Sequence, residues 1–153
     1  MIYALAFLIG LVAGLRAMTA PAVLSWAARL GWLDLQGTPL AWLGAAATPW
    51  IFTLAAVGED INDKLPKTGS RRAPPAFIAR IVTGSLCGAA VGAAGGALPA
   101  GLVSGAAGAV AGTLGGYELR VRLARAIGRD LPAALIEDVS AIVIALWSVR
   151  GPR

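Results

Sequence analysis

Five carboxylates stand inside or at the edge of apolar segments of this sequence. Glu137 and Asp138 lie about six residues into the last apolar run, while Glu59 and Asp60 end an earlier one, just before Asp63. A carboxylate at the centre of a bilayer costs about 2.5 to 3.5 kcal/mol on insertion scales, so it needs a cation, a wet cavity or a proton. We therefore predict that these residues bind a cation or a proton.

Each acidic pair also has an interpretation without a ligand. If the last apolar helix starts later, its acidic pair reaches the interface and only favours the helix N-terminus electrostatically. If the earlier helix begins at Pro49, Glu59 lies deep in the membrane. If it begins at Pro39, Glu59 is a solvated helix end that pairs with Lys64.

Arg16 is the matching cation, about 20 Å along the first apolar run by helical rise. A guanidinium at that depth needs an anion, which is either an intramembrane carboxylate or the phosphate or carboxylate of a ligand. Thr19 is suitable as the cap of a helix that restarts near Pro21, with its first N–H groups pointing inward. We predict that Arg16 pairs with the carboxylates or meets an anionic substrate.

Other kinds of chemistry find little support in the sequence. There is no histidine, and the single cysteine, Cys87, is typical of a small packing residue, so we predict no metal site. No nucleophile–base pair, phosphate-binding loop or dinucleotide motif is present, which favours a protein that is not an enzyme and has no cofactor. An acid chemistry of Glu137 and Asp138 within the membrane is the alternative. The net charge of +5 lies in short loops between apolar runs, which argues against nucleic acid.

The elements that position these residues are predicted to be membrane helices. The chain is 58% hydrophobic with a mean hydropathy of +0.74, and its few charges are bunched. We predict an all-α membrane protein forming one integral-membrane domain over residues 1–153, with the lipid bilayer as its environment. The predicted spans are roughly 2–17, 39–60, 76–96, 99–118 and 131–149, with an interfacial helix over roughly 20–31.

Basic residues set the predicted orientation. If the N-terminus is inside, nine of the thirteen Lys and Arg residues fall on one side and the tryptophans toward the other. This pattern favours a multi-pass protein of the bacterial inner membrane with a cytoplasmic N-terminus and a periplasmic C-terminus. The basic loops also contain candidates for binding lipid headgroups: Lys64, Lys67, Arg71, Arg72, Arg120 and Arg122.

Glycines recur at four-residue spacing in several apolar segments. Small residues at this spacing let helix backbones approach closely in lipid, which predicts glycine-zipper packing within the chain or between copies. A homo-oligomer, with a dimer favoured, follows from the small size of the chain, and a glycine-lined pore is the alternative. The glycines predicted to pack helices are Gly10, Gly14, Gly84, Gly88, Gly92, Gly96, Gly108, Gly112 and Gly116.

A weak internal similarity relates the first two predicted spans to the last two. Each half has a helix followed by a basic residue and then a helix bearing Glu-Asp. In a five-span topology these halves form an inverted repeat, an arrangement that many transporters use to build a midplane site. The alternative is chance similarity among helices rich in alanine and glycine.

Several segments of the sequence resemble a known family. GLRAMTAPAVLSWAARLGWLDLQGTPLAWLG, EDINDKLPKTGSRRAPPAFIARIVTGSLCGAAVGA, GAVAGTLGGYELR and ALIEDVSAI are similar to the bacterial integral-membrane family of domain of unknown function 4126. The resemblance covers nearly the whole chain and implies a membrane location, but no biochemical activity. The positions that match its motifs are Arg16, Pro21, Glu59, Asp63, Lys64, Pro66, Glu137 and Asp138.

Together these features predict a small transporter or channel-like protein. Its carboxylates would handle a cation or proton, and Arg16 would provide charge pairing or bind an anionic small molecule. The alternative is a membrane scaffold or anionic-lipid-binding protein that transports nothing.

Overall fold

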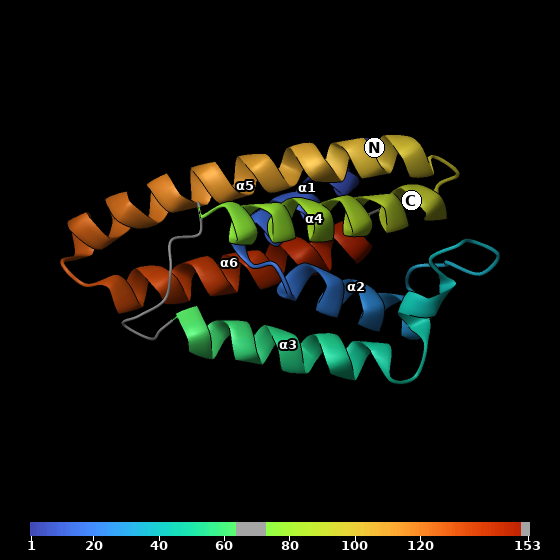
Figure 1. Ribbon diagram of the computed structural model, residues 1–153, viewed down its shortest axis with the longest axis horizontal. Coiled ribbons are helices and arrows are strands. Elements are labelled where there is room, and N and C mark those ends of the chain that lie inside the picture. The colour runs from blue at the N-terminus through green and yellow to red at the C-terminus, as the bar shows by residue number, and fades with distance from the viewer. Residues whose placement is uncertain (64–72, 151–153) are drawn as a thin grey trace.

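The computed structural model describes residues 1–63 and 73–150, and this part of the chain is helical, with no strand (Figure 1). Its helices pack side by side along the long axis of the molecule. In chain order they are α1 (Ile2–Leu15), α2 (Thr19–Arg29), the short 3-10 helix η1 (Ala41–Gly44), α3 (Thr48–Asp63), α4 (Pro74–Ala94), α5 (Leu98–Ile127) and α6 (Asp130–Arg150).

Three of the described helices are long and apolar enough to cross a membrane. They are α4, α5 and the Leu131–Arg150 part of α6, at the positions of the last three predicted spans. Helices α1 and α3 have 14 and 16 residues, fewer than the roughly 20 that a perpendicular span requires. The second predicted span also starts later, because residues 41–44 form η1 and α3 begins only at Thr48.

Helices α1 and α2 form a hairpin rather than a continuous span. Helix α1 ends at Leu15, and Arg16 adopts an extended conformation with φ −140° and ψ 107°, after which the chain reverses into α2. The segment predicted to be interfacial is α2, and it packs against α3, α4 and α6. Leu24 and Ser25 are fully buried there, so α2 lies inside the molecule.

Helices α1 and α5 run in the same direction. Gly108 lies against the backbone of Phe7, and eight residues further along both helices Gly116 lies against the side chain of Leu15. The predicted inverted repeat requires these two helices to run in opposite directions. The structure therefore contradicts the inverted repeat.

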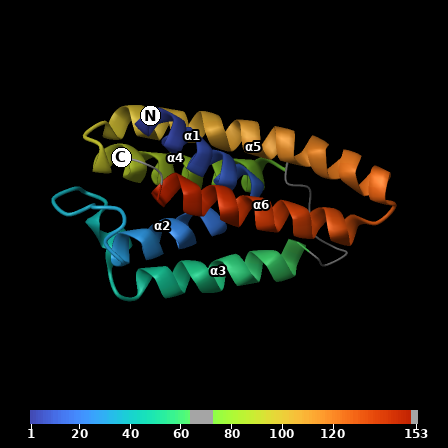
Figure 2. The ribbon, with the colours of Figure 1, turned by 180° about the vertical axis from the view of Figure 1, so that it is seen from behind.

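The start of α1 and the end of α6 lie at the end of the molecule that carries the α4–α5 turn (Figures 1 and 2). A Cβ built on Gly95 in that turn would lie 2.7 Å from the Ile2 side chain, and the Arg150 guanidinium stacks 3.8 Å from the ring centroid of Trp32. Because the chain turns back at Arg16, the start of α1 and the end of α6 lie at the same end of the described helices. The side of the membrane on which each terminus lies stays a prediction.

Glycines line the contacts between α1, α4 and α5. A Cβ on Gly10 would lie 2.1 Å from the carbonyl oxygen of Gly105, and one on Gly88 would lie 2.4 Å from that of Gly101. Only a residue without a side chain permits backbones to approach so closely. Gly96, predicted to continue the α4 stripe, instead occupies the α4–α5 turn with a φ of +71° and open space around it.

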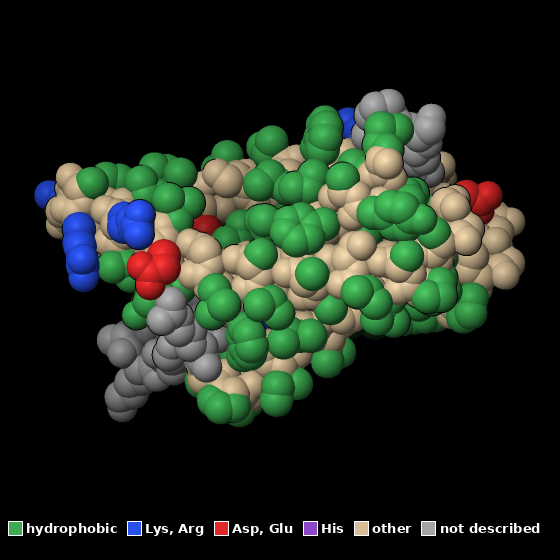
Figure 3. All heavy atoms as spheres, turned by 90° about the horizontal axis from the view of Figure 1, so that it is seen from above, with side chains coloured by type: hydrophobic (Ala, Val, Ile, Leu, Met, Phe, Trp, Pro, Cys, Tyr) green, Lys and Arg blue, Asp and Glu red, His purple; other side chains and the backbone are tan. Residues whose placement is uncertain are grey.

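Helix α3 is attached to the rest of the molecule along one side only. It packs mainly on α2 and η1, and Pro49 is its single buried residue. Large apolar side chains cover much of the face shown in Figure 3. On α3, the large apolar residues Ile51, Leu54 and Val57 are also exposed. Such a surface fits a lipid environment.

Candidate functional site

The guanidinium of Arg16 lies at the centre of a cluster of charges at the tip of the α1–α2 hairpin. Its Nη1 is 2.8 Å from Oδ1 of Asp60 and 3.0 Å from Oδ2 of Asp63, and its Nη2 donates to Oδ1 of Asp138. The Arg16 side chain is only 2% exposed. One side chain therefore joins the hairpin, α3 and α6.

Local structure explains why an arginine occupies this position. Arg16 follows the C-terminus of α1, where the helix dipole favours a cation. Asp60 and Asp63 are three residues apart on α3, which puts both carboxylates on one face of that helix. A guanidinium has five N–H donors in a rigid plane, so it can bind several carboxylates at once. The ammonium group of a lysine, on a flexible chain, is less suited to this role.

Glu59 binds the start of α2. Its Oε1 accepts the backbone N–H of Ala17 at 2.9 Å, and its Oε2 accepts that of Met18 at 2.8 Å. A carboxylate there satisfies N–H groups that a helix start leaves without partners and complements the positive end of the helix dipole. We predicted this capping role for Thr19. Helix α2 begins at Thr19 without a side-chain cap, and Glu59 from α3 supplies the acceptor instead.

Arg80 is a member of the cluster that the sequence analysis missed. Its Nη2 lies 3.5 Å from Oε1 of Glu59, and the residue is 5% exposed. Arg80 lies inside the predicted span 76–96 but was not among the predicted site residues. Pro74 and Pro75 could have indicated its place, because prolines are common at the first positions of a helix. A helix that starts there has Arg80 in its second turn.

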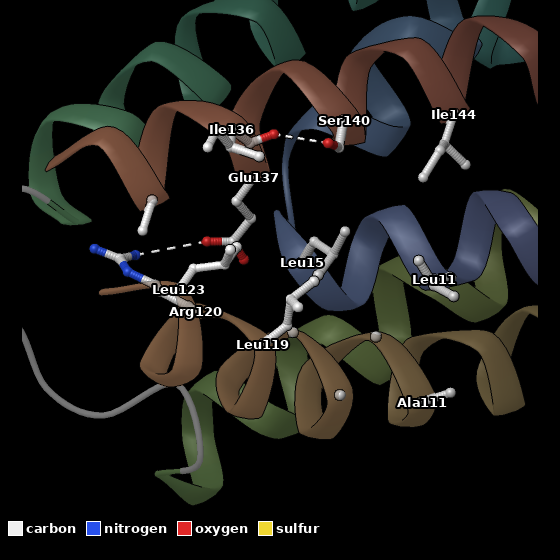
Figure 4. Close-up of a pocket in the computed structure, with 14 residues that line it drawn as sticks. Leu11, Leu15, Ala111, Leu119, Arg120, Leu123, Ile136, Glu137, Ser140 and Ile144 are labelled. Atoms are coloured by element: carbon white, nitrogen blue, oxygen red, sulfur yellow. Dashed lines mark hydrogen bonds and ion pairs between the residues drawn. The ribbon is translucent and has the colours of Figure 1, made fainter. Parts of the chain in front are cut away.

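Glu137 and Asp138 belong to two different sites. Successive residues of a helix point about 100° apart, so Asp138 faces Arg16 while Glu137 faces α5. There the Oε2 of Glu137 is 3.7 Å from Nη1 of Arg120, and the Glu137 side chain is 8% exposed (Figure 4). The structure thus separates Glu137 from the other predicted carboxylates.

A cavity of about 260 Å³ lies beside Glu137, between α1, α5 and α6 (Figure 4). Most of its lining is aliphatic, and glycines of α5 contribute part of its wall. Its polar side chains are those of Arg120, Glu137 and Ser140. Glu137 and Arg120 reach toward each other at one end, while Leu11 and Ile144 lie at the other.

The predicted lipid-headgroup residues are described only in part. Lys64, Lys67, Arg71 and Arg72 lie outside the described residues. Arg120 pairs with Glu137, and Arg122 on the same helix is exposed. Within residues 1–63 and 73–150, no group of three or more Cys, Asp and Glu side chains is arranged to hold a metal ion.

One side of the Arg16 cluster is open to solvent. The Asp60 side chain is 41% exposed there, whereas the Arg16 side chain is buried. The guanidinium keeps its charge at all physiological pH values. The Nε atom of Arg16 is buried with no hydrogen-bond partner among the described residues. The arrangement is a buried cation surrounded by acidic side chains, of which Asp60 is partly open to solvent.

No curated protein and no solved structure matches this chain. A family model does match, over residues 3–153. The chain belongs to the family described as domain of unknown function (DUF4126).

Proposed function

We propose that this protein is a small transporter or channel-like protein in which a proton or cation, bound by the carboxylates around Arg16, controls the position of α3. The observation that carries the proposal is the buried guanidinium of Arg16, which is shared by Asp60 and Asp63 of α3 and by Asp138 of α6. Buried charges in membrane proteins are costly and usually belong to substrate, ion or proton pathways.

Helix α3 has one apolar attachment and one charged attachment. Near its start, Trp50 packs edge to face on Trp26 at 5.1 Å, and the Trp26 indole N–H donates to Thr53 at 3.0 Å. Near its end, Asp60 and Asp63 bind Arg16. The aromatic contact is insensitive to protons, so it acts as a pivot when the charged end is released.

Protons and cations act directly on the charged attachment. A proton on Asp60 or Asp63, or a cation beside them, weakens the attraction to Arg16 and favours a state in which the end of α3 has moved away. Glu59 adds to this coupling because it joins α3 to the first N–H groups at the start of α2. Movement of α3 would thus expose the start of α2 as well as Arg16, the two groups suited to an anionic substrate.

The bacterial inner membrane and the following orientation are part of the proposal. Arg122, Arg125 and Arg129 are exposed at the α5–α6 end, where most of the basic side chains visible in Figure 3 gather, which supports a cytoplasmic location of that end. Trp50 lies in the first turn of α3 and Trp147 lies near the end of α6, as expected for an aromatic belt at the opposite interface. Both termini would then be periplasmic.

Two neighbouring residues of α6 provide a matched test. The full chain is reconstituted in liposomes, a pH or potassium gradient is imposed, and the internal pH is followed with a trapped dye. Asp138→Asn removes a carboxylate from Arg16 and should slow proton flux about tenfold or more, because it leaves the buried guanidinium short of a partner. Glu137→Gln removes the same charge one residue away and should change the flux less than about twofold.

The same measurement can refute the proposal. Wild-type liposomes that conduct no better than protein-free liposomes under either gradient would favour a scaffold that transports nothing. Equal rates in Asp138→Asn and the wild type would remove the Arg16 cluster from the mechanism. Asp138→Glu restores the acid and should recover flux, which separates a functional loss from a folding defect.

A further inference from the structure

We propose that the cavity between α1, α5 and α6 holds one acyl chain of a phospholipid, with the headgroup phosphate bound by Arg120. This site is separate from the Arg16 cluster and does not depend on transport. It rests on the shape of the cavity, on the position of its polar residues and on the charge at its end.

The cavity has the length of one leaflet. Its outermost lining residues on α6 are Ala133 and Ile144, eleven positions apart, which corresponds to about 16 Å along the helix. That is about half of the roughly 30 Å hydrocarbon core of a bilayer. A chain lying parallel to the helices would fill the cavity from the interface to the middle of the membrane.

The wall of the cavity suits a hydrocarbon chain. Leu11 and Leu15 of α1 face Leu119 of α5 and Ile136 of α6 across it. Gly115 lines it without narrowing it, since a Cβ there would have no atom within 4 Å. An acyl chain that enters the cavity from the bilayer exchanges one apolar environment for another and gains only closer packing. Affinity above that of bulk lipid must therefore come from the headgroup.

Charge identifies the headgroup as anionic. Arg120 lines the cavity at the end where α5 carries its basic residues, among them the exposed Arg122 and Arg125. Arg120 lies 3.7 Å from Glu137 and has five N–H donors, so it can bind a phosphate in addition to the partners it already has.

The test uses the purified full chain in detergent, titrated with dioleoyl phosphatidylglycerol and observed by native mass spectrometry. Arg120→Gln should weaken the binding of this lipid about fivefold, as expected for one basic residue at a membrane surface. Arg122→Gln, which removes the same charge from the same helix outside the cavity, should leave it within about twofold. Equal weakening by both variants would show diffuse attraction to the basic end and overturn the proposal.

A second pair of variants tests the cavity itself. Gly115→Leu fills it and should weaken lipid binding about tenfold, whereas Ala107→Leu adds the same bulk at an exposed position of α5 and should have no effect. Ser140→Leu is a second way to fill the cavity if Gly115→Leu is poorly folded. If the filled variants bind the lipid as tightly as the wild type, the cavity does not hold an acyl chain. The same conclusion follows if glycerol phosphate binds as tightly as the whole lipid.

Discussion

The chain joins its helices in two physically different ways. Helices α1, α4 and α5 meet through glycines, with backbone against backbone, whereas α3 meets the hairpin tip and α6 through charges around Arg16. Dispersion contacts of the first kind are dense and do not depend on pH or ions. Ion pairs of the second kind change with every proton or cation that binds. The difference supports the proposed division into a fixed scaffold and a movable α3.

The largest effect is expected where the scaffold is tightest. A side chain at Gly105 would put its Cβ 2.2 Å from the carbonyl oxygen of Gly84, and the backbones of α4 and α5 cannot yield. We expect Gly105→Leu to lower the free energy of unfolding by about 3 kcal/mol or more, measured by denaturant titration in micelles.

A glycine of α3 provides the contrast. A Cβ added at Gly58 would have no atom within 4 Å, so Gly58→Ala should raise the free energy of unfolding by about 0.5 to 1 kcal/mol in the same titration.

Removing the central cation should loosen α3 and leave the scaffold intact. Arg16→Gln leaves carboxylates of two helices without their cation, and we expect a loss of about 2 to 3 kcal/mol, since the partly exposed Asp60 regains water. Hydrogen exchange should accelerate in the end of α3 and in the start of α2. If α4 and α5 lost protection to the same extent, the division into scaffold and movable helix would be wrong.

Glu59→Gln tests the link between α3 and α2. The amide keeps one acceptor but loses the charge, so one of the N–H groups of Ala17 and Met18 loses its partner. We expect a cost of about 1 to 2 kcal/mol and faster exchange of these two amides. Thr19→Ala should cost much less, because the Thr19 side chain does not cap α2. A larger loss for Thr19→Ala than for Glu59→Gln would refute this assignment.

The smallest effect separates the two aspartates of α3. The Asp60 side chain is 41% exposed and that of Asp63 is 10% exposed. Exposed ion pairs contribute about 0 to 1 kcal/mol, so Asp60→Asn should alter stability by less than 1 kcal/mol, and Asp63→Asn by more. Thermal unfolding of the two variants at low and high salt measures the contrast, and the reverse order would contradict the burial argument.

Local patterns predicted the scaffold better than the cluster. Hydropathy located α4, α5 and most of α6, and the four-residue spacing of glycines marked the faces along which α4 and α5 meet. Arg16 and Asp138 were recognised as charges in need of partners, and the structure brings them together. The direction of α1, the reversal at Arg16, and the recruitment of Arg80 were not predicted.

The sequence by itself determined which segments are apolar helices and which charges had to find partners, because both follow from the free energy of placing single residues in a membrane. Only the tertiary structure decided which partners they found. Glycine spacing reads the same for parallel and antiparallel helices, so it could not set α1 parallel to α5. The sequence also could not show that Asp138 and Glu137 belong to different sites. Neighbouring residues of α6 point about 100° apart, but their partners depend on which helices pack on the two sides of α6.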